Sequence, residues 1–143
     1  MKRAIEILLE NNEFLILTHR KPDGDTTGSA VALCEGLRSL GKTAYLLEDH
    51  GMTEKYRVYA MEYYAPKGFE PKCVVAVDIA SGKLLPEDAL CYSDDILLAI
   101  DHHVVHVPFS KERYVDPSSA ACGEAIYDVL MGLGVQFNQT MAE

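Results

Sequence analysis

The sequence predicts an α/β fold in which a mostly parallel sheet of about five strands is flanked by helices. Short apolar runs that end at polar or turn residues indicate buried strands. Stretches with apolar residues at helical spacing separate these runs along the chain. Buried strands that alternate with helices are typical of a parallel sheet with helices on both faces. The sequence contains no internal repeat and no low-complexity tract.

Five runs supply the predicted strands, and three of them (FLIL, CVVAVD and ILLAI) are expected to form buried strands. Continuous apolar runs of this kind suit strands that are buried on both faces. The last of the five runs is expected to form an edge strand. The predicted strands are residues 14–17, 43–47, 73–78, 96–100 and 111–114.

Helical periodicity predicts the segments between the strands. Ile5, Leu8 and Leu9 share one face of a short first helix. Gly41 is suited to follow the end of the second helix, because a left-handed residue often occupies that position. Asn138 is a good N-cap for a last helix. The predicted helices are residues 4–9, 27–40, 54–64, 120–131 and 139–143, with a short helical piece at 86–92.

Four tyrosines at positions 56, 59, 63 and 64 fall mostly on one side of the predicted 54–64 helix. Packing in the core or at its rim is the expected reason, because aromatic rings bury large apolar areas. Stacking against a nucleobase is the alternative.

Composition indicates one globular domain. A chain of 143 residues has the usual size of a single domain and can bury a core without disulfides. The formal net charge of −9 excludes a broad basic face for long nucleic acid. No apolar run reaches the length of about 18 residues that a membrane span needs, so no membrane partner is expected. Glu6 and Glu10 interrupt the apolar start, which argues against a signal peptide.

The four cysteines point to a reducing compartment. They are widely spaced and form no C-x-x-C pair, which argues against a zinc knot. Each lies in or beside an apolar segment, as expected for buried reduced thiols. A cytoplasmic location is therefore expected. The cysteines are Cys34, Cys73, Cys91 and Cys122.

The loop after the first strand carries an imidazole and two carboxylates: His19, Asp23 and Asp25. Ligands bind at the carboxyl ends of strands in open α/β sheets. Two carboxylates this close repel each other unless a cation lies between them. Imidazole and carboxylate ligands together suit a divalent ion such as Mn²⁺ or Zn²⁺. A solvated, well-capped loop is the alternative for this segment taken alone.

Two more strands end in similar chemistry. The third strand ends at Asp78, and the fourth runs into Asp101, His102 and His103. Neighbouring strand ends lie about 5 Å apart on one edge of a parallel sheet, so these groups are expected to meet the first loop there. A pair of divalent ions about 3.5–4 Å apart would offset the repulsion, and such pairs hydrolyse phosphate esters. Asp78 alone could instead close a turn with Ser81.

The segments THRKPDGDTTGS, VAVDIAS and AIDHH resemble the first three motifs of the DHH phosphoesterase family. That family includes RecJ-like exonucleases, nanoRNases that also dephosphorylate pAp, cyclic dinucleotide phosphodiesterases and family II pyrophosphatases. The order and spacing fit over most of the chain. The segment YVDPSSAACGEAIYDVL resembles the loop and helix that follow in nanoRNase-like members. The resemblance therefore implies a DHH-type N-terminal domain, nearest to the nanoRNase and pAp phosphatase members.

The resemblance also implies a site with two Mn²⁺ ions, for which Mg²⁺ or another divalent ion could substitute. His19, Asp23 and Asp78 would hold one ion, and Asp25, Asp78 and His102 would hold the other. Asp78 would then bridge the two ions, and a water that the metal activates would attack phosphorus in line.

For the remaining residues, the resemblance implies roles around the substrate. His103 would contact the scissile phosphate or assist the leaving group, and Asp101 would orient a histidine from behind. Ser118 and Ser119, at a predicted helix start, could present backbone N–H groups to an anion. The expected substrates are short oligonucleotides and pAp, followed by cyclic dinucleotides and pyrophosphate.

Two parts of the family pattern are not found in residues 1–143. One is a fourth motif with an Asp that completes the second metal site, and the other is a smaller C-terminal domain that grips the substrate. We therefore expect a DHH domain that is incomplete at its C-terminus, with an intact first metal site and slow turnover. The expected partners are the phosphate ester, the missing C-terminal domain in the full-length form, and a second copy in a homodimer.

Two alternatives remain open at this point. Asp23, Gly24 and Asp25 with the threonines that follow satisfy the D-x-D-x-T pattern of haloacid dehalogenase-like phosphatases, in which the first Asp is the nucleophile. In that pattern the Asp directly follows the strand, whereas residues 19–22 intervene here, and Asp101, His102 and His103 would have no role. The second alternative is a non-catalytic relic that binds metal, nucleotide or only a partner chain.

Overall fold

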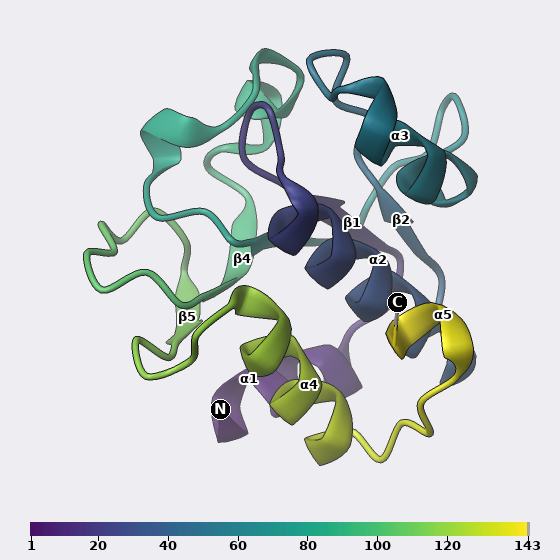
Figure 1. The fold of residues 1–143 in the computed structure, drawn as a ribbon, viewed down its shortest axis with the longest axis vertical. Coiled ribbons are helices and arrows are strands. Elements are labelled where there is room, and N and C mark those ends of the chain that lie inside the picture. Colours follow the sequence, from purple (N-terminus) through teal and green to yellow (C-terminus); the bar gives the residue numbers. More distant parts are fainter. Residues whose placement is uncertain (143) are drawn as a thin grey trace.

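The computed structural model describes residues 1–142 and has a five-stranded sheet at its centre (Figure 1). The strand order is β2-β1-β3-β4-β5, and every neighbouring pair is parallel. The predicted α/β fold with about five strands is confirmed. The strands are β1 (Phe14–Leu17), β2 (Ala44–Leu46), β3 (Cys73–Val77), β4 (Ile96–Asp101) and β5 (Glu112–Val115).

The predicted helices are present with shifted ends, and Glu143, the last residue of the predicted 139–143 helix, lies outside the described residues. The 27–40 helix begins earlier than predicted, because the Asp23 carboxylate accepts the Thr26 N–H at 3.0 Å and caps it. The predicted 54–64 helix is divided into an α-helix and a 3₁₀ turn. The α-helices are α1 (Lys2–Glu10), α2 (Gly24–Ser39), α3 (Glu54–Ala60), α4 (Cys122–Gly132) and α5 (Gln139–Ala142), and the 3₁₀ helices are η1 (Met61–Tyr63), η2 (Gly82–Leu84) and η3 (Glu87–Tyr92).

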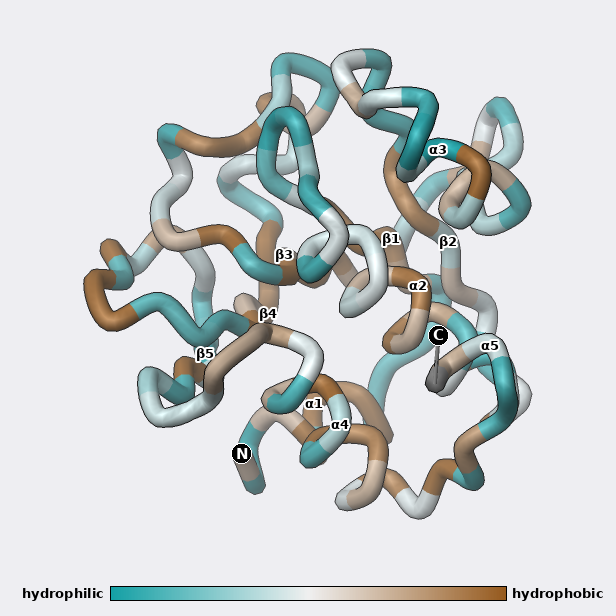
Figure 2. Tube along the Cα trace, viewed as in Figure 1, coloured by the Kyte–Doolittle hydropathy of each residue, from teal (hydrophilic) through white to brown (hydrophobic). Residues whose placement is uncertain are grey.

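The two faces of the sheet are covered by different layers. Phe14 and Ile16 of β1 pack into a core with α1, α2 and α4. Leu15 and Leu17 point to the opposite core, which η2 and η3 help to cover. Burial on both faces explains the unbroken apolar runs of the central strands, which Figure 2 shows in the middle of the trace. The second face therefore carries short 3₁₀ helices, one of which corresponds to the short helical piece predicted at residues 86–92.

A bulge keeps β3 and β4 in register at their carboxyl ends. The pairing shifts at the start of β4, where Leu97 is an extra residue between Ile96 and Leu98. A bulge of this kind adds one residue to one strand without ending the ladder. Beyond it the pairing is regular, so Asp78 and Asp101 arrive at the same edge of the sheet.

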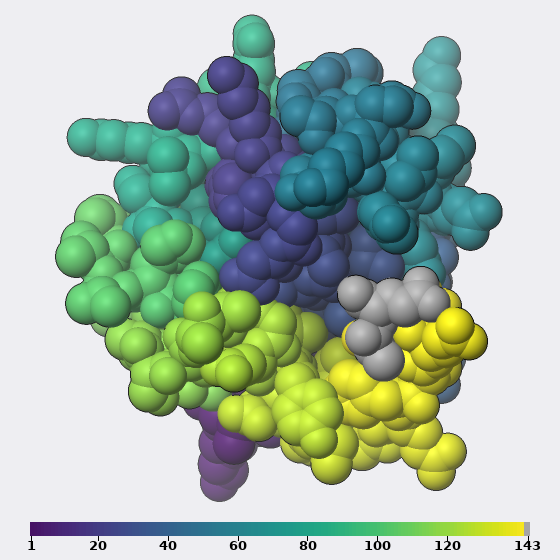
Figure 3. Space-filling model, in the orientation of Figure 1, coloured from purple at the N-terminus to yellow at the C-terminus, as the bar shows by residue number. Residues whose placement is uncertain are grey.

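The tyrosines of the 54–64 segment divide into two groups. Tyr56, Tyr63 and Tyr64 are partly buried against the main core, as expected for packing. Tyr59 is 61% exposed. Tyr56 and Tyr59 also line an apolar groove of about 880 Å³ that α2, α3, α4 and α5 border. Figure 3 shows α2 lying between α3 and α4 on this face. A stacking role for these rings stays a prediction.

Three of the four cysteines are buried, and all four are free thiols, while Cys91 is exposed on η3. The expectation of burial was therefore wrong for Cys91, because the outward side of a surface 3₁₀ helix carries it. No helix in the described part of the chain is long and apolar enough to cross a membrane.

We predict opposite effects of alanine at two glycines of α2. A Cβ at Gly36 would lie 2.4 Å from Leu130 Cδ2 of α4, whereas a Cβ at Gly28 would meet nothing within 4 Å. Gly36→Ala should lower the free energy of unfolding by about 1–2 kcal/mol through overpacking. Gly28→Ala should raise it by about 0.5–1 kcal/mol through helix propensity. Urea unfolding measures both, and equal shifts would contradict tight packing between α2 and α4.

Candidate metal centre

The three central strands bring the predicted residues to one edge of the sheet. β1 leads into His19, β3 into Asp78, and β4 ends at Asp101 and continues into His102. Because β1 pairs with β3 and β3 pairs with β4, these strand ends are immediate neighbours. The strand order therefore places all three motifs together, as the sequence required.

His19, Asp23 and Asp78 form one group of candidate metal ligands, with one ligand atom from each lying within 4.8 Å of the others. His19 Nδ1 lies 2.8 Å from the carbonyl oxygen of Arg20. A carbonyl only accepts, so Nδ1 carries the proton and Nε2 of the neutral ring keeps its lone pair. That nitrogen lies on the side of the group, 4.0 Å from Asp78 Oδ2.

The hydroxyl of Thr26 lies between these three ligands. Its Oγ1 is 2.7 Å from His19 Nε2, 3.0 Å from Asp23 Oδ1 and 2.5 Å from Asp78 Oδ2. A hydroxyl has a single hydrogen to donate, so it can satisfy only one of these acceptors at a time. The other two keep unshared lone pairs, and one ligand atom from each of the three residues lies within 4.8 Å of the others. This donor set fits a divalent cation.

The surroundings of the Asp78 carboxylate are unfavourable for a negative charge unless a cation is bound nearby. Asp78 is only 3% exposed, and its Oδ1 has no hydrogen-bond partner among the described residues. Burial raises the pKa of its carboxyl, and the charge of Asp25 raises it further against the opposing hydrogen bond from Thr26. Its backbone also has φ 59°, a left-handed conformation that costs energy for any residue but glycine.

Asp78 also belongs to a second candidate group, with His102 and His103. His102 Nδ1 lies 3.3 Å from the carbonyl oxygen of Ser119, so a carbonyl again holds the proton on Nδ1. Its Nε2 is 3.6 Å from Asp78 Oδ1 and 3.6 Å from Asp25 Oδ2. His102 therefore offers a free nitrogen lone pair between two carboxylates, as a metal ligand should.

His103 is held in a different way. Its Nδ1 lies 2.6 Å from Asp101 Oδ1, and the same nitrogen lies 3.7 Å from Asp78 Oδ1. A nitrogen whose proton is bonded to Asp101 has no lone pair for a metal, so His102 is the better ligand of the two. Burial acts to lower the pKa of His103, but the hydrogen bond to Asp101 and the charges of Asp101 and Asp78 raise it overall.

Asp101 is fully buried, and four hydrogen bonds satisfy its carboxylate. The donors are the backbone N–H groups of His102 and His103 and the Nδ1 atoms of His103 and His106, at 2.8, 3.3, 2.6 and 2.7 Å. Burial disfavours the charged form, yet these hydrogen bonds outweigh it and lower the pKa of Asp101. The group is therefore an ionised acceptor that can fix the direction of a histidine.

Asp25 lies beside the centre, 3.6 Å from His102 Nε2, and has structural partners of its own. Its carboxylate accepts the backbone N–H groups of Cys122 and Gly123, at 2.8 and 3.0 Å, and the Ser29 hydroxyl at 3.3 Å. A carboxylate from α2 thus caps the N-terminus of α4, where the helix dipole favours negative charge. The candidate groups found among the described residues do not include Asp25. Its role as a ligand of a second ion stays a prediction.

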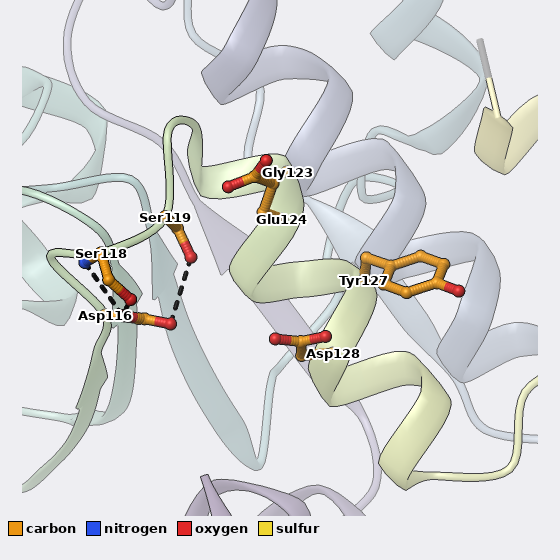
Figure 4. Close-up of a pocket in the computed structure, with 7 residues that line it drawn as sticks. All are labelled: Asp116, Ser118, Ser119, Gly123, Glu124, Tyr127 and Asp128. Atoms are coloured by element: carbon orange, nitrogen blue, oxygen red, sulfur yellow. Dashed lines mark hydrogen bonds between the residues drawn. The ribbon is translucent and has the colours of Figure 1, made fainter.

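The side chains of Ser118 and Ser119 turn toward Asp116 (Figure 4). Ser118 donates its N–H and its hydroxyl to Asp116 Oδ1, at 3.0 and 2.5 Å, and the Ser119 hydroxyl donates to Oδ2 at 3.2 Å. Both residues precede α4 and form no part of its first turn. Glu124 and Asp128 line the same pocket of about 470 Å³, and their charges disfavour an anion there. A role for the two serines in substrate binding stays a prediction.

Three supporting residues escaped the sequence analysis: Thr26, Asp49 and His106. Asp49 is buried after β2, and its side chain accepts the N–H groups of Lys21 at 3.3 Å and Gly51 at 2.7 Å. It thereby fixes the loop that carries His19 and Asp23, in which Lys21 adopts φ 56°. An acidic residue just after an apolar run was the available signal for Asp49.

The chain matches the model of the DHH family N-terminal domain over residues 13–143. The chain belongs to the DHH family. This membership agrees with the order of the three motifs and with the position of the candidate ligands at neighbouring strand ends.

Three similar proteins place this DHH domain among longer chains. The bifunctional oligoribonuclease and PAP phosphatase NrnA of Thermus thermophilus is 32% identical over 129 residues, which are 89% of this chain and 39% of NrnA. The cyclic-di-AMP phosphodiesterase GdpP of Geobacillus thermodenitrificans is 23% identical over 87% of this chain and 22% of GdpP. An exopolyphosphatase-related protein of Bacteroides fragilis shares the fold, with a TM-score of 0.76 and 18% identity over 94% of this chain and 44% of its own. The chain spans less than half the length of each.

We predict that Asp78→Asn stabilises the metal-free protein. The pKa of folded Asp78 lies above the ordinary value of 3.8, so the metal-free protein loses stability as the pH rises from that value through the raised pKa. At neutral pH the substitution should raise the free energy of unfolding by about 1–3 kcal/mol, because it removes a buried charge on a carboxylate whose Oδ1 has no hydrogen-bond donor. The gain should vanish below pH 3.8, where the carboxyl is protonated in both states.

Chemical unfolding in a chelating buffer at several pH values measures this effect. Asp94→Asn changes an exposed carboxylate and should leave stability unaltered. A metal-free Asp78→Asn protein that is less stable than the parent at neutral pH would show that the charge is already compensated.

Proposed function

We propose that this DHH-family chain is a divalent-metal-dependent phosphoesterase that acts on short oligonucleotides or nucleotides. The observation that carries the proposal is Asp78, a buried carboxylate with an unpartnered oxygen that two groups of candidate ligands share. NrnA is an oligoribonuclease and PAP phosphatase, and GdpP is a cyclic-di-AMP phosphodiesterase. Each of these activities cleaves a phosphate ester bond, which supports the same chemistry here.

The metal ligands that we assign are those of the sequence analysis. His19, Asp23 and Asp78 would hold one ion, and Asp25, Asp78 and His102 would hold the other. Two imidazoles with several carboxylate oxygens suit Mn²⁺, with Mg²⁺ as the alternative. When bound, such ions polarise a phosphoryl oxygen and lower the pKa of a nearby water.

His103 is our candidate for handling the proton and the phosphate. Because its Nδ1–H donates to ionised Asp101, the opposite ring nitrogen becomes more basic. Its side chain is 43% exposed, so a substrate can reach it. We assign it contact with the scissile phosphate and donation of a proton to the leaving oxygen. Asp101 keeps the ring in the required tautomer.

Exposed cations beside the centre support an anionic substrate. Arg20 and Lys21 lie in the loop after β1, and Lys83 lies in η2. The Arg20 N–H donates to the carbonyl oxygen of Leu84 at 2.8 Å, which brings these two segments together. In a chain with a net charge of −9, these side chains would attract a phosphate to the rim of an acidic site. Short oligonucleotides and pAp are the first candidates, followed by cyclic dinucleotides and pyrophosphate.

Two further parts of the proposal concern the setting of the domain. The free thiols fit a reducing cytoplasm. Since the chain spans 39% of NrnA, we propose that full activity needs a further metal-binding Asp and a domain that grips the substrate. Turnover by residues 1–143 alone should then be slow while metal binding persists.

The haloacid dehalogenase-like alternative would use Asp23 as a nucleophile. Asp23 Oδ1 already accepts the Thr26 N–H, lies 3.0 Å from the Thr26 hydroxyl oxygen, and caps α2. Membership of the DHH family and the convergence of Asp78 and His102 favour the metal-dependent reaction. A trapped phosphoaspartate at Asp23 would reverse this choice.

We predict that His19→Ala weakens Mn²⁺ binding by more than about tenfold, since even residues behind the ligands contribute that much. Isothermal titration of the metal-free protein with Mn²⁺ gives the affinity. His50→Ala is the matched control, because His50 is an exposed imidazole paired with Asp88 outside both candidate groups. Unaltered binding by His19→Ala would remove the first metal site.

We predict that the protein releases p-nitrophenol from bis-p-nitrophenyl phosphate with Mn²⁺, less with Mg²⁺, and not at all with a chelator. His102→Ala should abolish the metal-dependent release, because it removes a ligand whose Nε2 lies between two carboxylates. Comparison of pAp, a short oligoribonucleotide and cyclic di-AMP then ranks the substrates. No release at any metal concentration would favour the non-catalytic relic.

A further inference from the structure

We propose that His106 is a positioning residue for the reaction, which holds Asp101 and through it the imidazole of His103. This inference rests on the proposed phosphoesterase function. His106 lies outside the three motifs, in the segment that returns from the edge of the sheet after His103. Its side chain is 5% exposed, and its Nδ1 lies 2.7 Å from Asp101 Oδ2.

The hydrogen-bond partners of His106 fix its tautomer. Asp101 is an ionised carboxylate and can only accept, so Nδ1 of His106 carries the proton. Its Nε2 is buried with no partner among the described residues. A proton on Nε2 would bury a donor without an acceptor, which is costly in an apolar setting. His106 therefore donates a single hydrogen bond, from its Nδ1 to Asp101 Oδ2.

The two oxygens of Asp101 have different donors. Oδ1 receives the N–H groups of His102 and His103 and the Nδ1–H of His103. Oδ2 receives the Nδ1–H of His106 and no other bond found in the described chain. The terminal torsion of an aspartate is soft, and rotation about it moves both oxygens together. The bond from His106 to Oδ2 therefore resists the same rotation as the bonds at Oδ1, and it helps to hold the plane of the carboxylate and the direction of the His103 ring.

His106 can do this because its own segment is anchored. The next residue, Val107, donates its N–H to the carbonyl oxygen of Ala80 at 2.8 Å, which ties the segment to the loop after Asp78. The ring centroids of His106 and Phe109 are 5.7 Å apart, and Phe109 packs against the second core. Val104, by contrast, is strongly exposed. His106 thus marks the point where the loop becomes fixed again.

The test compares His106→Asn with His106→Leu. Asparagine can place an amide N–H near Asp101 Oδ2, and leucine has a similar shape without a donor. With bis-p-nitrophenyl phosphate and Mn²⁺, His106→Leu should lower kcat by about 10–100-fold with little change in KM, whereas His106→Asn should stay within about threefold of the parent. Equal losses of kcat in the two variants would overturn the proposal.

Histidine tautomers in the metal-free protein give a readout that does not depend on activity. Long-range ¹H–¹⁵N spectra at alkaline pH should show His103 as the Nδ1–H tautomer in the parent and in His106→Asn. In His106→Leu a mixture of tautomers should appear. An unchanged His103 tautomer in folded His106→Leu would overturn the proposal even if kcat falls. Absence of hydrolysis in the parent would count against the phosphoesterase function, while the spectra would still decide the role of His106.

Discussion

Burial of the Asp78 carboxylate at the end of the central strand is the constraint on which this structure depends. The residue has an unpartnered oxygen, a left-handed backbone and a carboxylate neighbour in Asp25. Each of these features costs stability, and together they persist only where the surrounding structure fixes them. The Asp78 N–H continues the ladder by donating to Ile100 at 2.9 Å, and Thr26 donates to its other oxygen. A cation bound here would offset the charges of Asp78 and Asp25 and would give the unpartnered oxygen a partner.

The imidazoles of this centre differ in the group that accepts the hydrogen bond from their Nδ1. Backbone carbonyls accept from Nδ1 of His19 and His102, and a carboxylate accepts from Nδ1 of His103. A neutral acceptor fixes the tautomer with little added basicity, which suits a metal ligand. An ionised acceptor makes the outer nitrogen more basic, which suits a group that binds phosphate or moves a proton. Residues of identical type thus differ in the basicity of their outer nitrogen because their hydrogen-bond partners differ.

The sequence predicted the parts of the site that depend on strand order and missed those that depend on tertiary contacts. A polar residue directly after a buried strand must lie at the sheet edge, so Asp78 and His102 could be found from local pattern alone. The bond between His106 and Asp101 depends on how a loop returns, and no periodicity reveals that path. Ser118 looked like the start of a helix, but the nearby Asp116 carboxylate captured its N–H and its hydroxyl. At this position the hydrogen bonds to the Asp116 side chain replaced the helix start that the local sequence favoured.

Asp25 caps a helix and also lies close to a candidate metal ligand. Its carboxylate caps α4 through Cys122 and Gly123 while His102 approaches it from β4. A carboxylate has about four lone-pair sites, so it can cap a helix and still contribute to a metal site. A divalent ion that drew on Asp25 would pull negative charge away from the helix N-terminus, whereas tight capping would weaken its donation to the ion. If Asp25 binds a second ion, as we propose, the packing of α4 on α2 would affect how strongly that ion is held, and a substitution at that interface would change metal affinity without changing a ligand.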